Sequence, residues 1–318
     1  MNKNIFYAIV GLILSSYILV SCNEKHKGNR TDTYSSGAIS FASDESFSPI
    51  IDEEIQVFES VYPNAKVKPI YTNEIDGIDM LKKNKVCLVV TTRDLTKGEY
   101  AYFESKQFQP RAIRIAYDGF ALIVNKANTD TCITVNNIRR ILSGEIKNWK
   151  QLNPKSRLGG IEVVFSNGKS STVRFAVDSI LGGKPINSPN ISATDKTAEV
   201  LDYVEKTPNS IGIIGSNWLN DRRDSTNITF NKKIRVMSVS KMKTATPYNS
   251  WKPYQAYLYN GNYPLIRTIY ALLNDPINGL PWGFAHFMES PKGQMIIFKT
   301  GLLPMQGNIT IRDINVNE

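Results

Sequence analysis

The sequence predicts an α/β protein with two cores, because short apolar strands alternate with amphipathic helices in two successive runs. In the first run, residues 37–42 form an apolar strand. Apolar residues from Phe47 to Val61 then recur at steps of three and four, which is the period of one helix face. The run continues with strand 67–71, helix 75–81 and strand 86–91. Such alternation indicates parallel strands joined by right-handed crossovers.

A second run of the same kind follows Asp118. Its expected elements are strand 119–125, helix 135–142, strand 161–165, helices 172–181 and 197–204, and strand 210–214. The tail from Tyr254 onward carries helix signals without an obvious sheet of its own. We therefore expect residues 37–118 and 254–318 to form one lobe and residues 119–253 to form the other.

The first 22 residues have the pattern of a lipoprotein signal peptide. Lys3 precedes the apolar stretch 5–20, which is shorter than the roughly 20 residues that a membrane-spanning helix needs. The stretch ends in Leu19-Val20-Ser21-Cys22, which resembles the bacterial lipobox, whose cysteine is lipidated after cleavage. The polar segment 23–36 predicts a flexible tether. We expect an exported protein anchored to a membrane through Cys22, with the inner or outer membrane left open.

Composition narrows the function classes. The chain has 38 Lys and Arg against 29 acidic residues, a formal net charge of +9, which favours an anionic partner. The export signal makes nucleic acid an unexpected partner. The only histidines are His26 and His286, and no cysteine or carboxylate cluster has the spacing of metal ligands. We therefore expect no enzyme, no catalytic residue, no metal and no cofactor.

The two remaining cysteines, Cys87 and Cys132, leave a disulfide possible in an oxidising compartment. Cys87, however, lies inside the apolar run 86–90. That position predicts a buried small hydrophobic residue within a strand instead.

Loops that follow strands are the places to seek a ligand, because helix N-termini there present free N–H groups. The first such loop, 43–47, contains Ser46 at the start of a helix. The second, 91–95, contains Arg93. Either residue, taken alone, has an ordinary explanation as a helix cap or a surface side chain.

The third loop, 166–172, is the most informative. A glycine and the three consecutive hydroxyls of Ser170, Ser171 and Thr172 suit a nest of donors around a small oxyanion. A helix start ordinarily favours acidic residues, yet Lys169 and Arg174 flank this one. The loop therefore predicts a binding site for an anion from outside the chain.

With these loops in place, the sequence resembles the phosphate-binding proteins that serve phosphate ABC transporters, in the form common in lipoproteins of the Bacteroidetes. The stretches that carry the resemblance cover nearly the whole mature chain: 44–47, 58–63, 92–96, 141–149, 170–172, 211–215, 263–267 and 292–304. The resemblance implies the two-lobed periplasmic binding protein fold of the type II kind. In that fold crossing strands form a hinge and the ligand is held in a cleft between the lobes.

The resemblance also implies roles for individual residues. Ser46 and Phe47 match the first-loop pair that gives phosphate a hydroxyl and a backbone N–H. The hydroxyl loop 170–172 matches the family's Ser-Gly-Thr helix start, with Ser171 in place of glycine. Thr92 stands where some members have an aspartate, and Ser166 stands where some have an arginine.

Because the arginine is missing at Ser166, we infer that Arg93 supplies the cationic contact from the other lobe, since a guanidinium can donate two hydrogen bonds to an oxyanion. Hydrogen phosphate also carries a proton and tolerates a carboxylate acceptor. Asp44, Glu45 and Glu74 are the candidates for that acceptor.

The resemblance finally implies capture of inorganic phosphate in the periplasm and its transfer to the permease subunits of an ABC importer. We expect a monomer. Binding of sulfate or molybdate, and a sensory or surface lipoprotein that kept the fold, stay open as alternatives. A hydrolase would need a nucleophile beside a base, and the chain offers no suitably placed histidine.

Overall fold

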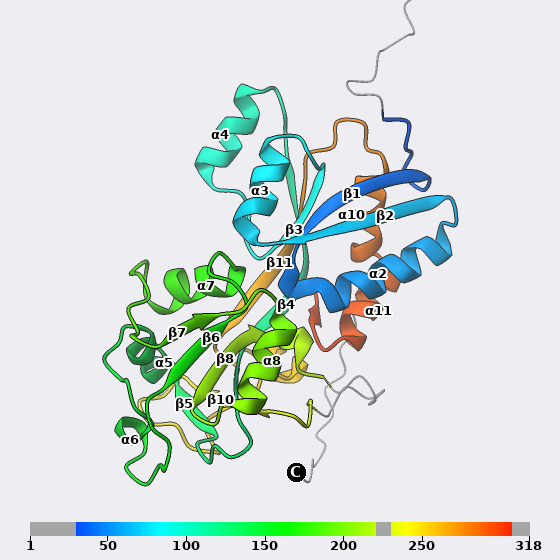
Figure 1. Ribbon diagram of the computed structural model, residues 1–318. Coiled ribbons are helices and arrows are strands. Elements are labelled where there is room, and N and C mark those ends of the chain that lie inside the picture. Colours follow the sequence, from blue (N-terminus) through cyan, green and yellow to red (C-terminus); the bar gives the residue numbers. More distant parts are fainter. Residues whose placement is uncertain (1–29, 221–229, 307–318) are drawn as a thin grey trace, which may run out of the picture.

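The computed structural model describes residues 30–220 and 230–306. The signal peptide predicted for residues 1–22, with its lipobox cysteine Cys22, lies outside these residues. One mixed sheet runs through both halves of the described chain, and helices cover both of its faces (Figure 1).

Among the described residues, the main sheet contains ten strands and a smaller sheet contains two. The order along the main sheet is β2 (Ala65–Thr72), β1 (Gly37–Asp44), β3 (Leu88–Thr91), β11 (Ile266–Leu273), β4 (Arg111–Val124), β8 (Ser210–Gly215), β6 (Glu162–Phe165) and β7 (Ile191–Ala193), with β9 (Arg235–Val236) and β12 (Leu303–Pro304) paired to β4. The smaller sheet pairs β5 (Cys132–Thr134) with β10 (Ser238–Ser240). The parallel strands predicted from the alternation are present within each half, since β1 runs parallel to β2 and β3, and β6 runs parallel to β7 and β8.

The helices connect these strands. They are α2 (Ser48–Val61), α3 (Glu74–Lys82), α4 (Lys97–Ser105), α5 (Val135–Leu142), α6 (Trp149–Leu152), α7 (Ser171–Phe175), α8 (Thr197–Lys206), α9 (Gln255–Tyr259), α10 (Leu280–Glu289) and α11 (Pro291–Lys299). Short turns of helix add η1 (Glu45–Phe47), η2 (Ala176–Ile180) and η3 (Ser216–Trp218). The single helix predicted for residues 172–181 is instead α7 followed by the π-helical turn η2.

Strand β4 joins the two halves. Its residues 111–119 pair antiparallel with β11, and its residues 120–124 pair antiparallel with β8 on the other side. Strand β11 lies between β3 and β4 and was not predicted. Its burial alternates between half-buried and buried over residues 266–271, but the buried position 267 holds an arginine and the half-buried positions include Ile266 and Tyr270. Its sequence therefore lacks the clean apolar and polar alternation that marks a half-exposed strand.

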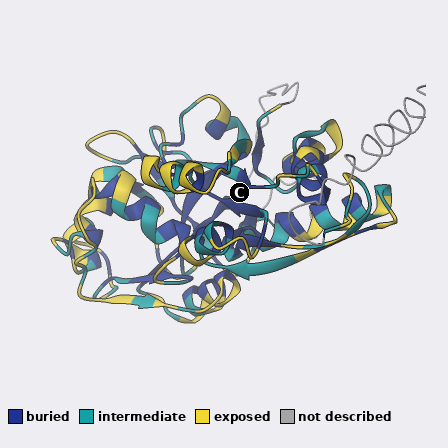
Figure 2. Ribbon diagram, turned by 90° about the horizontal axis from the view of Figure 1, so that it is seen from above, coloured by how far each residue is buried: buried dark blue, intermediate teal, exposed yellow. Residues whose placement is uncertain are grey.

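Side chains that alternate along the strands supply separate hydrophobic clusters on the two faces of each half. In the first half, Phe41 packs with α2, α10 and α11, whereas the next residue, Ala42, packs with α3 and α4. In the second half, Phe120 packs on the side of α5, whereas Ala121 packs on the side of α8. Figure 2 shows this burial concentrated along the strands, with exposed residues on the outer surfaces of the helices.

Two parts of the predicted division need correction. The tail was expected to re-enter the first lobe near Tyr254, but Leu258, Tyr263 and Leu265 pack in the cluster of the second half. The chain returns to the first half only at β11, and α10 and α11 then pack there. The bounds of the two lobes otherwise stay a prediction.

The end of the predicted tether also differs. Arg30 forms an ion pair with Asp275 at 3.0 Å, and Asp32 accepts a hydrogen bond from the N–H of Leu280 at 2.7 Å. Residues 30–36 are therefore held against the domain. Cys87, predicted inside a strand, precedes β3 and is half-buried, with its Sγ 2.9 Å from Arg30 Nη1.

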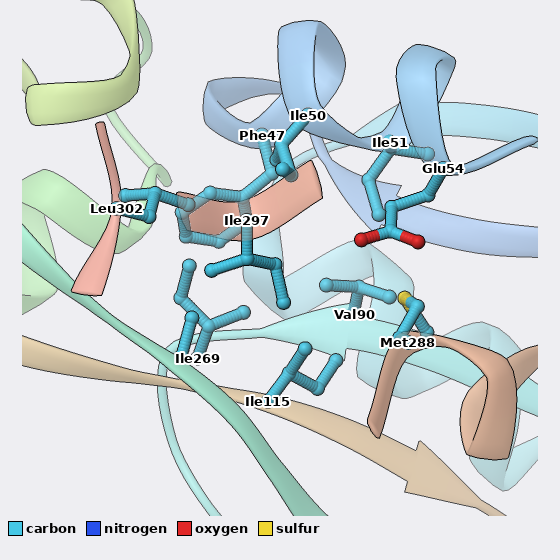
Figure 3. Close-up of a pocket in the computed structure, with 11 residues that line it drawn as sticks. Phe47, Ile50, Ile51, Glu54, Val90, Ile115, Ile269, Met288, Ile297 and Leu302 are labelled. Atoms are coloured by element: carbon cyan, nitrogen blue, oxygen red, sulfur yellow. The ribbon is translucent and has the colours of Figure 1, made fainter. Parts of the chain in front are cut away.

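An apolar pocket in the first half encloses the carboxyl group of Glu54, which projects from α2 (Figure 3). The pocket walls come from α2, β3, β4, β11, α10 and α11, and no other charged side chain lines it. Glu54 is 1% exposed, and neither of its carboxyl oxygens has a hydrogen-bond partner among the described residues. Burial raises the pKa of Glu54 to about 9.

Replacing Glu54 with methionine, which has a similar length and no polar oxygen, should therefore stabilise the protein. Near pH 5 the gain should be about 1–3 kcal/mol, the usual cost of an unpaired buried polar group. The folded state keeps a proton that the unfolded chain loses above its ordinary pKa of 4.5, so wild-type stability falls as the pH rises from there toward 9. Urea unfolding at pH 5 and pH 8 measures both effects. Glu54→Gln is the control, since it should lose the pH dependence without the full gain, and an undiminished pH dependence in either variant would contradict the assignment.

Candidate anion-binding site

The three strand-end loops singled out in the sequence meet where the two halves of the molecule face each other. Ser46 follows β1, Thr92 follows β3, and Ser171 follows β6. A hydrogen bond links the two halves directly: Asp44 Oδ2, in the first half, accepts from the backbone N–H of Ser171, in the second half, at 3.3 Å. Hydroxyl groups from both halves thus lie around one region.

The first loop is organised by Asp44, the residue at the end of β1. Its Oδ1 accepts hydrogen bonds from the N–H of Ser46 at 2.9 Å and from the Ser46 hydroxyl at 2.6 Å. The Ser46 carbonyl accepts two bonds from the other half, from Asn217 at 2.9 Å and Trp218 at 2.8 Å. Phe47, predicted beside Ser46, packs its ring in the core of the first half. Burial raises the pKa of Asp44, so this carboxyl takes up a proton more readily than an exposed one.

The third loop forms the start of α7. Ser170 is the N-cap, and its hydroxyl accepts a hydrogen bond from the N–H of Val173 at 3.3 Å and lies 2.9 Å from the Thr172 hydroxyl. The Ser171 hydroxyl accepts a bond from Arg267 Nη1 at 3.1 Å. All three hydroxyl residues predicted for this loop are buried.

The second loop is tied to a carboxylate, that of Glu74 at the start of α3. Glu74 Oε2 accepts hydrogen bonds from the hydroxyls of Thr91 at 2.7 Å and Thr92 at 3.0 Å. Arg174, from the second half, pairs with the same carboxylate and donates to the Thr92 hydroxyl at 2.8 Å. Burial, the largest single effect, would raise the pKa of Glu74, but the charge and hydrogen bonds of Arg174, the hydroxyl of Thr91 and the charge of Arg93 together hold that pKa below its usual range.

Arg93, inferred to supply the cationic contact, is engaged elsewhere. It donates two hydrogen bonds to Glu99, at 2.7 and 2.8 Å, and its Nε lies 3.6 Å from Glu74 Oε1. Glu99 is held there because it forms a capping box with Thr96 at the start of α4. Burial, the largest single effect, would raise the pKa of Glu99, but the hydrogen bonds and charge of Arg93 together with the hydrogen bonds from Thr96 lower it to about 2. The predicted role of Arg93 stays a prediction, and Arg174 is the guanidinium that contacts Thr92.

Two arginines of the site were not predicted as binding residues. Arg174 lies four residues after Ser170, one helical turn further on, so both side chains share a face of the helix. That spacing was visible in the sequence. Arg267 ends the motif 263–267, but nothing local to the motif indicates that its side chain reaches Ser171.

Arg267 is held by a buried ion pair with Asp118. The two residues face each other across the β4–β11 ladder, and both side chains are almost inaccessible to solvent. Asp118 Oδ1 also accepts hydrogen bonds from the N–H and the hydroxyl of Ser216, both at 2.8 Å. The guanidinium carbon of Arg267 lies 5.6 Å from the centre of the Phe47 ring. One side chain therefore contacts residues of both halves.

The polar groups of the site are hydroxyls, backbone N–H groups, guanidinium groups and carboxylates, and His286 lies away from it on α10. Within residues 30–220 and 230–306, no group of His, Cys, Asp and Glu side chains has an arrangement that suits a metal ion. The same ranges contain no helix long and apolar enough to cross a bilayer.

Comparison with known proteins places this architecture in a family. The model of the PBP superfamily domain matches residues 28–292, so the chain belongs to the periplasmic binding protein superfamily, a family of solute-binding proteins. The expected fold class, α/β with two lobes of this type, is confirmed.

Comparison with individual proteins agrees with this family assignment. The chain is similar to the phosphate-binding protein PstS of Borreliella burgdorferi, with 26% identity over 304 residues that span 93% of this chain and 97% of the relative. It also resembles a solved structure from Clostridium perfringens, described as a phosphate ABC transporter substrate-binding protein with bound phosphate. That match has a TM-score of 0.69 and 22% identity, and covers 85% of this chain and all of the other. An ABC-type phosphate transport receptor from Vibrio cholerae matches with a TM-score of 0.62 and 22% identity, over 83% of this chain and 99% of the other.

Replacing Arg267 with methionine should destabilise the protein by about 3–5 kcal/mol, because it leaves the buried carboxylate of Asp118 without its counter-charge. Urea unfolding measures the loss. Removing both charges, in the double variant Asp118→Leu with Arg267→Met, should cost less than the sum of the two single changes. The control is Lys66→Met, at an exposed ion pair with Glu59, which should cost less than about 1 kcal/mol. Equal losses at Arg267 and Lys66 would contradict the role of the buried pair.

Proposed function

We propose that this chain is an extracytoplasmic solute-binding protein that captures inorganic phosphate between its two halves for an ABC-type importer. The observation that carries the proposal is the convergence of three strand-end loops, which brings hydroxyl, N–H and guanidinium donors of both halves to one place. A tetrahedral oxyanion is satisfied by such donors approaching from several sides. The relatives named for phosphate binding support the choice of ligand.

Phosphate is favoured over sulfate and molybdate by the carboxylates within the site. A fully ionised oxyanion can only accept hydrogen bonds, so a carboxylate beside it has nothing to receive and repels it. Hydrogen phosphate has a proton to donate. Asp44 is the best-placed acceptor of the three candidates, because its partners Ser46 and Ser171 are neutral groups of the proposed site. Glu45 is instead bonded to Thr197, and Glu74 forms an ion pair with Arg174.

The binding residues proposed from the first half are Ser46, the backbone of Phe47, and Thr92, and those from the second half are Ser170, Ser171 and Thr172. To these we add Arg174 as the cationic contact, because it already lies 2.8 Å from the Thr92 hydroxyl. Arg93 is the alternative cation, and exchange of its partner Glu99 would be needed first. We propose no catalytic step, since His286, the histidine among the described residues, lies on α10 away from the hydroxyls of the site.

Titration calorimetry of residues 30–318 against phosphate, arsenate, sulfate and molybdate tests the ligand. Phosphate and arsenate should bind at least about 100-fold more tightly than sulfate, since an unpaired buried carboxylate rejects an ion without a proton. Comparable affinity for sulfate would favour the alternative of a general oxyanion-binding protein. No binding of any of the four would favour a sensory or surface lipoprotein that kept the fold.

The same titration assigns the binding residues. Ser171→Ala and Thr172→Ala should each cost about 1.5–3 kcal/mol, roughly 10- to 150-fold in dissociation constant, through loss of one charge-assisted hydrogen bond. Arg174→Met should cost at least as much. Arg93→Met decides between the two guanidinium groups, and Lys147→Ala, a surface lysine, should change the affinity by less than about threefold. Equal effects at Arg174 and Lys147 would mean diffuse electrostatic attraction instead of a site.

We further propose that the mature protein is a monomer anchored in the periplasm by lipid on Cys22, where it meets the permease subunits of the importer. Changing Cys22 to Ala in the full-length chain should release the protein from the membrane fraction with unchanged phosphate affinity, since the proposed binding residues all lie at position 46 or later in the sequence. Cell fractionation and titration measure the two outcomes. A variant that stays wholly in the membrane fraction would contradict anchoring through this cysteine.

A further inference from the structure

The carboxylate of Glu74 is the group that pairs with the cation of the opposite half. It is carried by the first residue of α3, in the first half, and its side chain is 1% exposed. The Arg174 side chain belongs to α7, in the second half, and is 27% exposed. The ion pair between them therefore spans the two halves, at the same place as the hydroxyl of Thr92.

The contacts of this carboxylate are those that a bound oxyanion would need. Glu74 Oε2 accepts bonds from the N–H of Thr92 at 3.3 Å, from the Thr92 hydroxyl at 3.0 Å and from Arg174 Nη2 at 3.4 Å, while Oε1 accepts from Arg174 Nε. Thr92 and Arg174 are two of the residues proposed to bind phosphate. The carboxylate thus uses the donors of the site itself.

A second acidic residue contacts the same guanidinium but does not link the halves. Asp178 Oδ2 lies 3.1 Å from Arg174 Nη1, and the two residues are one helical turn apart in the same half. Asp178 also adds negative charge beside Arg174, and its ion pair lies within one half, so the pair itself does not depend on closure; across the halves Asp178 acts only through a weaker attraction to Arg93. The two carboxylates therefore allow the effect of charge to be separated from the effect of closure.

We propose that Glu74 is an internal counter-anion that closes the cleft by pairing with Arg174 and competes with the captured anion for Arg174 and Thr92. Only the second part of this inference, the competition with a captured anion, rests on the proposed function; the closing role does not. When the pair is formed, the halves are held together without a ligand, and an incoming anion must displace the carboxylate. The apparent affinity is then reduced by the fraction of molecules in which the donors are already taken.

Glu74→Gln tests both parts in the soluble domain, residues 30–318, and Asp178→Asn is the matched control. Without added anion, small-angle scattering should show a larger radius of gyration for Glu74→Gln than for the wild type, and no change for Asp178→Asn. Addition of phosphate should bring Glu74→Gln back to the wild-type radius. In titration calorimetry the Glu74→Gln variant should bind phosphate about tenfold more tightly, the order expected when a charge-assisted competitor is removed.

The outcomes separate the two parts of the proposal from each other and from the proposed function. An unchanged radius for Glu74→Gln, with native circular dichroism, would overturn the closing role whether or not phosphate binds. Weaker phosphate binding by Glu74→Gln would overturn competition and would make Glu74 a supporting residue. Equal gains for Glu74→Gln and Asp178→Asn would reduce the effect to local charge. A wild type that binds none of the four anions would refute the proposed function and leave the scattering result to decide the closing role.

If Glu74→Gln folds poorly, scattering of the wild type at low and high salt replaces it, since salt should open a partly exposed ion pair and expand the molecule.

Discussion

The buried ion pair of Arg267 and Asp118 is the interaction on which the arrangement of the two halves depends. Asp118 lies at the point of β4 where pairing changes from β11 to β8, so the pair is at the junction of the halves. Two charges removed from water are costly unless their remaining hydrogen bonds are satisfied. Ser216 satisfies Asp118 from the second half, and Ser171 accepts from Arg267. The pair therefore favours one register between β4 and β11, and it fixes the positions of the segments that carry Ser216 and Ser171.

Much of the fold followed from local periodicity in the sequence. The helix predicted for residues 135–142 has those bounds, and the strand predicted for 210–214 differs by one residue. Strand β11 escaped prediction because a buried position holds Arg267 while Ile266 and Tyr270 are only half-buried, so apolar and polar residues do not alternate along it. Likewise, residues 258–265 pack with the second half because of contacts distant in sequence, which no local pattern can reveal. Local signals therefore predicted many of the elements but neither β11 nor the order of the strands at the junction.

The candidate site likewise has one part that could be predicted from the sequence and one part that could not. Its hydroxyl loops were predictable, because residues after parallel strands meet at one edge of a sheet. The choice of the cation was not. Arg93 and Arg174 each follow a loop that carries hydroxyl residues. They differ in the carboxylate with which each forms its ion pair, which is Glu99 for Arg93 and Glu74 for Arg174. Glu99 is brought beside Arg93 by the capping box of α4, while Glu74 lies a hundred residues from Arg174 in sequence. From the neighbouring residues in the sequence alone, both arginines would be predicted to be unpaired positive charges.

The positive charge inferred from the third loop is consequently not the charge of the assembled site. Arg174 is balanced by Glu74 and Arg267 by Asp118, so the excess of basic residues in the composition does not accumulate where the loops meet. Attraction of an anion then depends on exchange of partners at short range. The Arg267 side chain is 1% exposed and the Arg174 side chain 27%. An exchange at Arg267 would disrupt the junction of the strands, whereas one at Arg174 leaves the core intact. The more exposed arginine is therefore the one free to serve a ligand, and the buried one is committed to the fold.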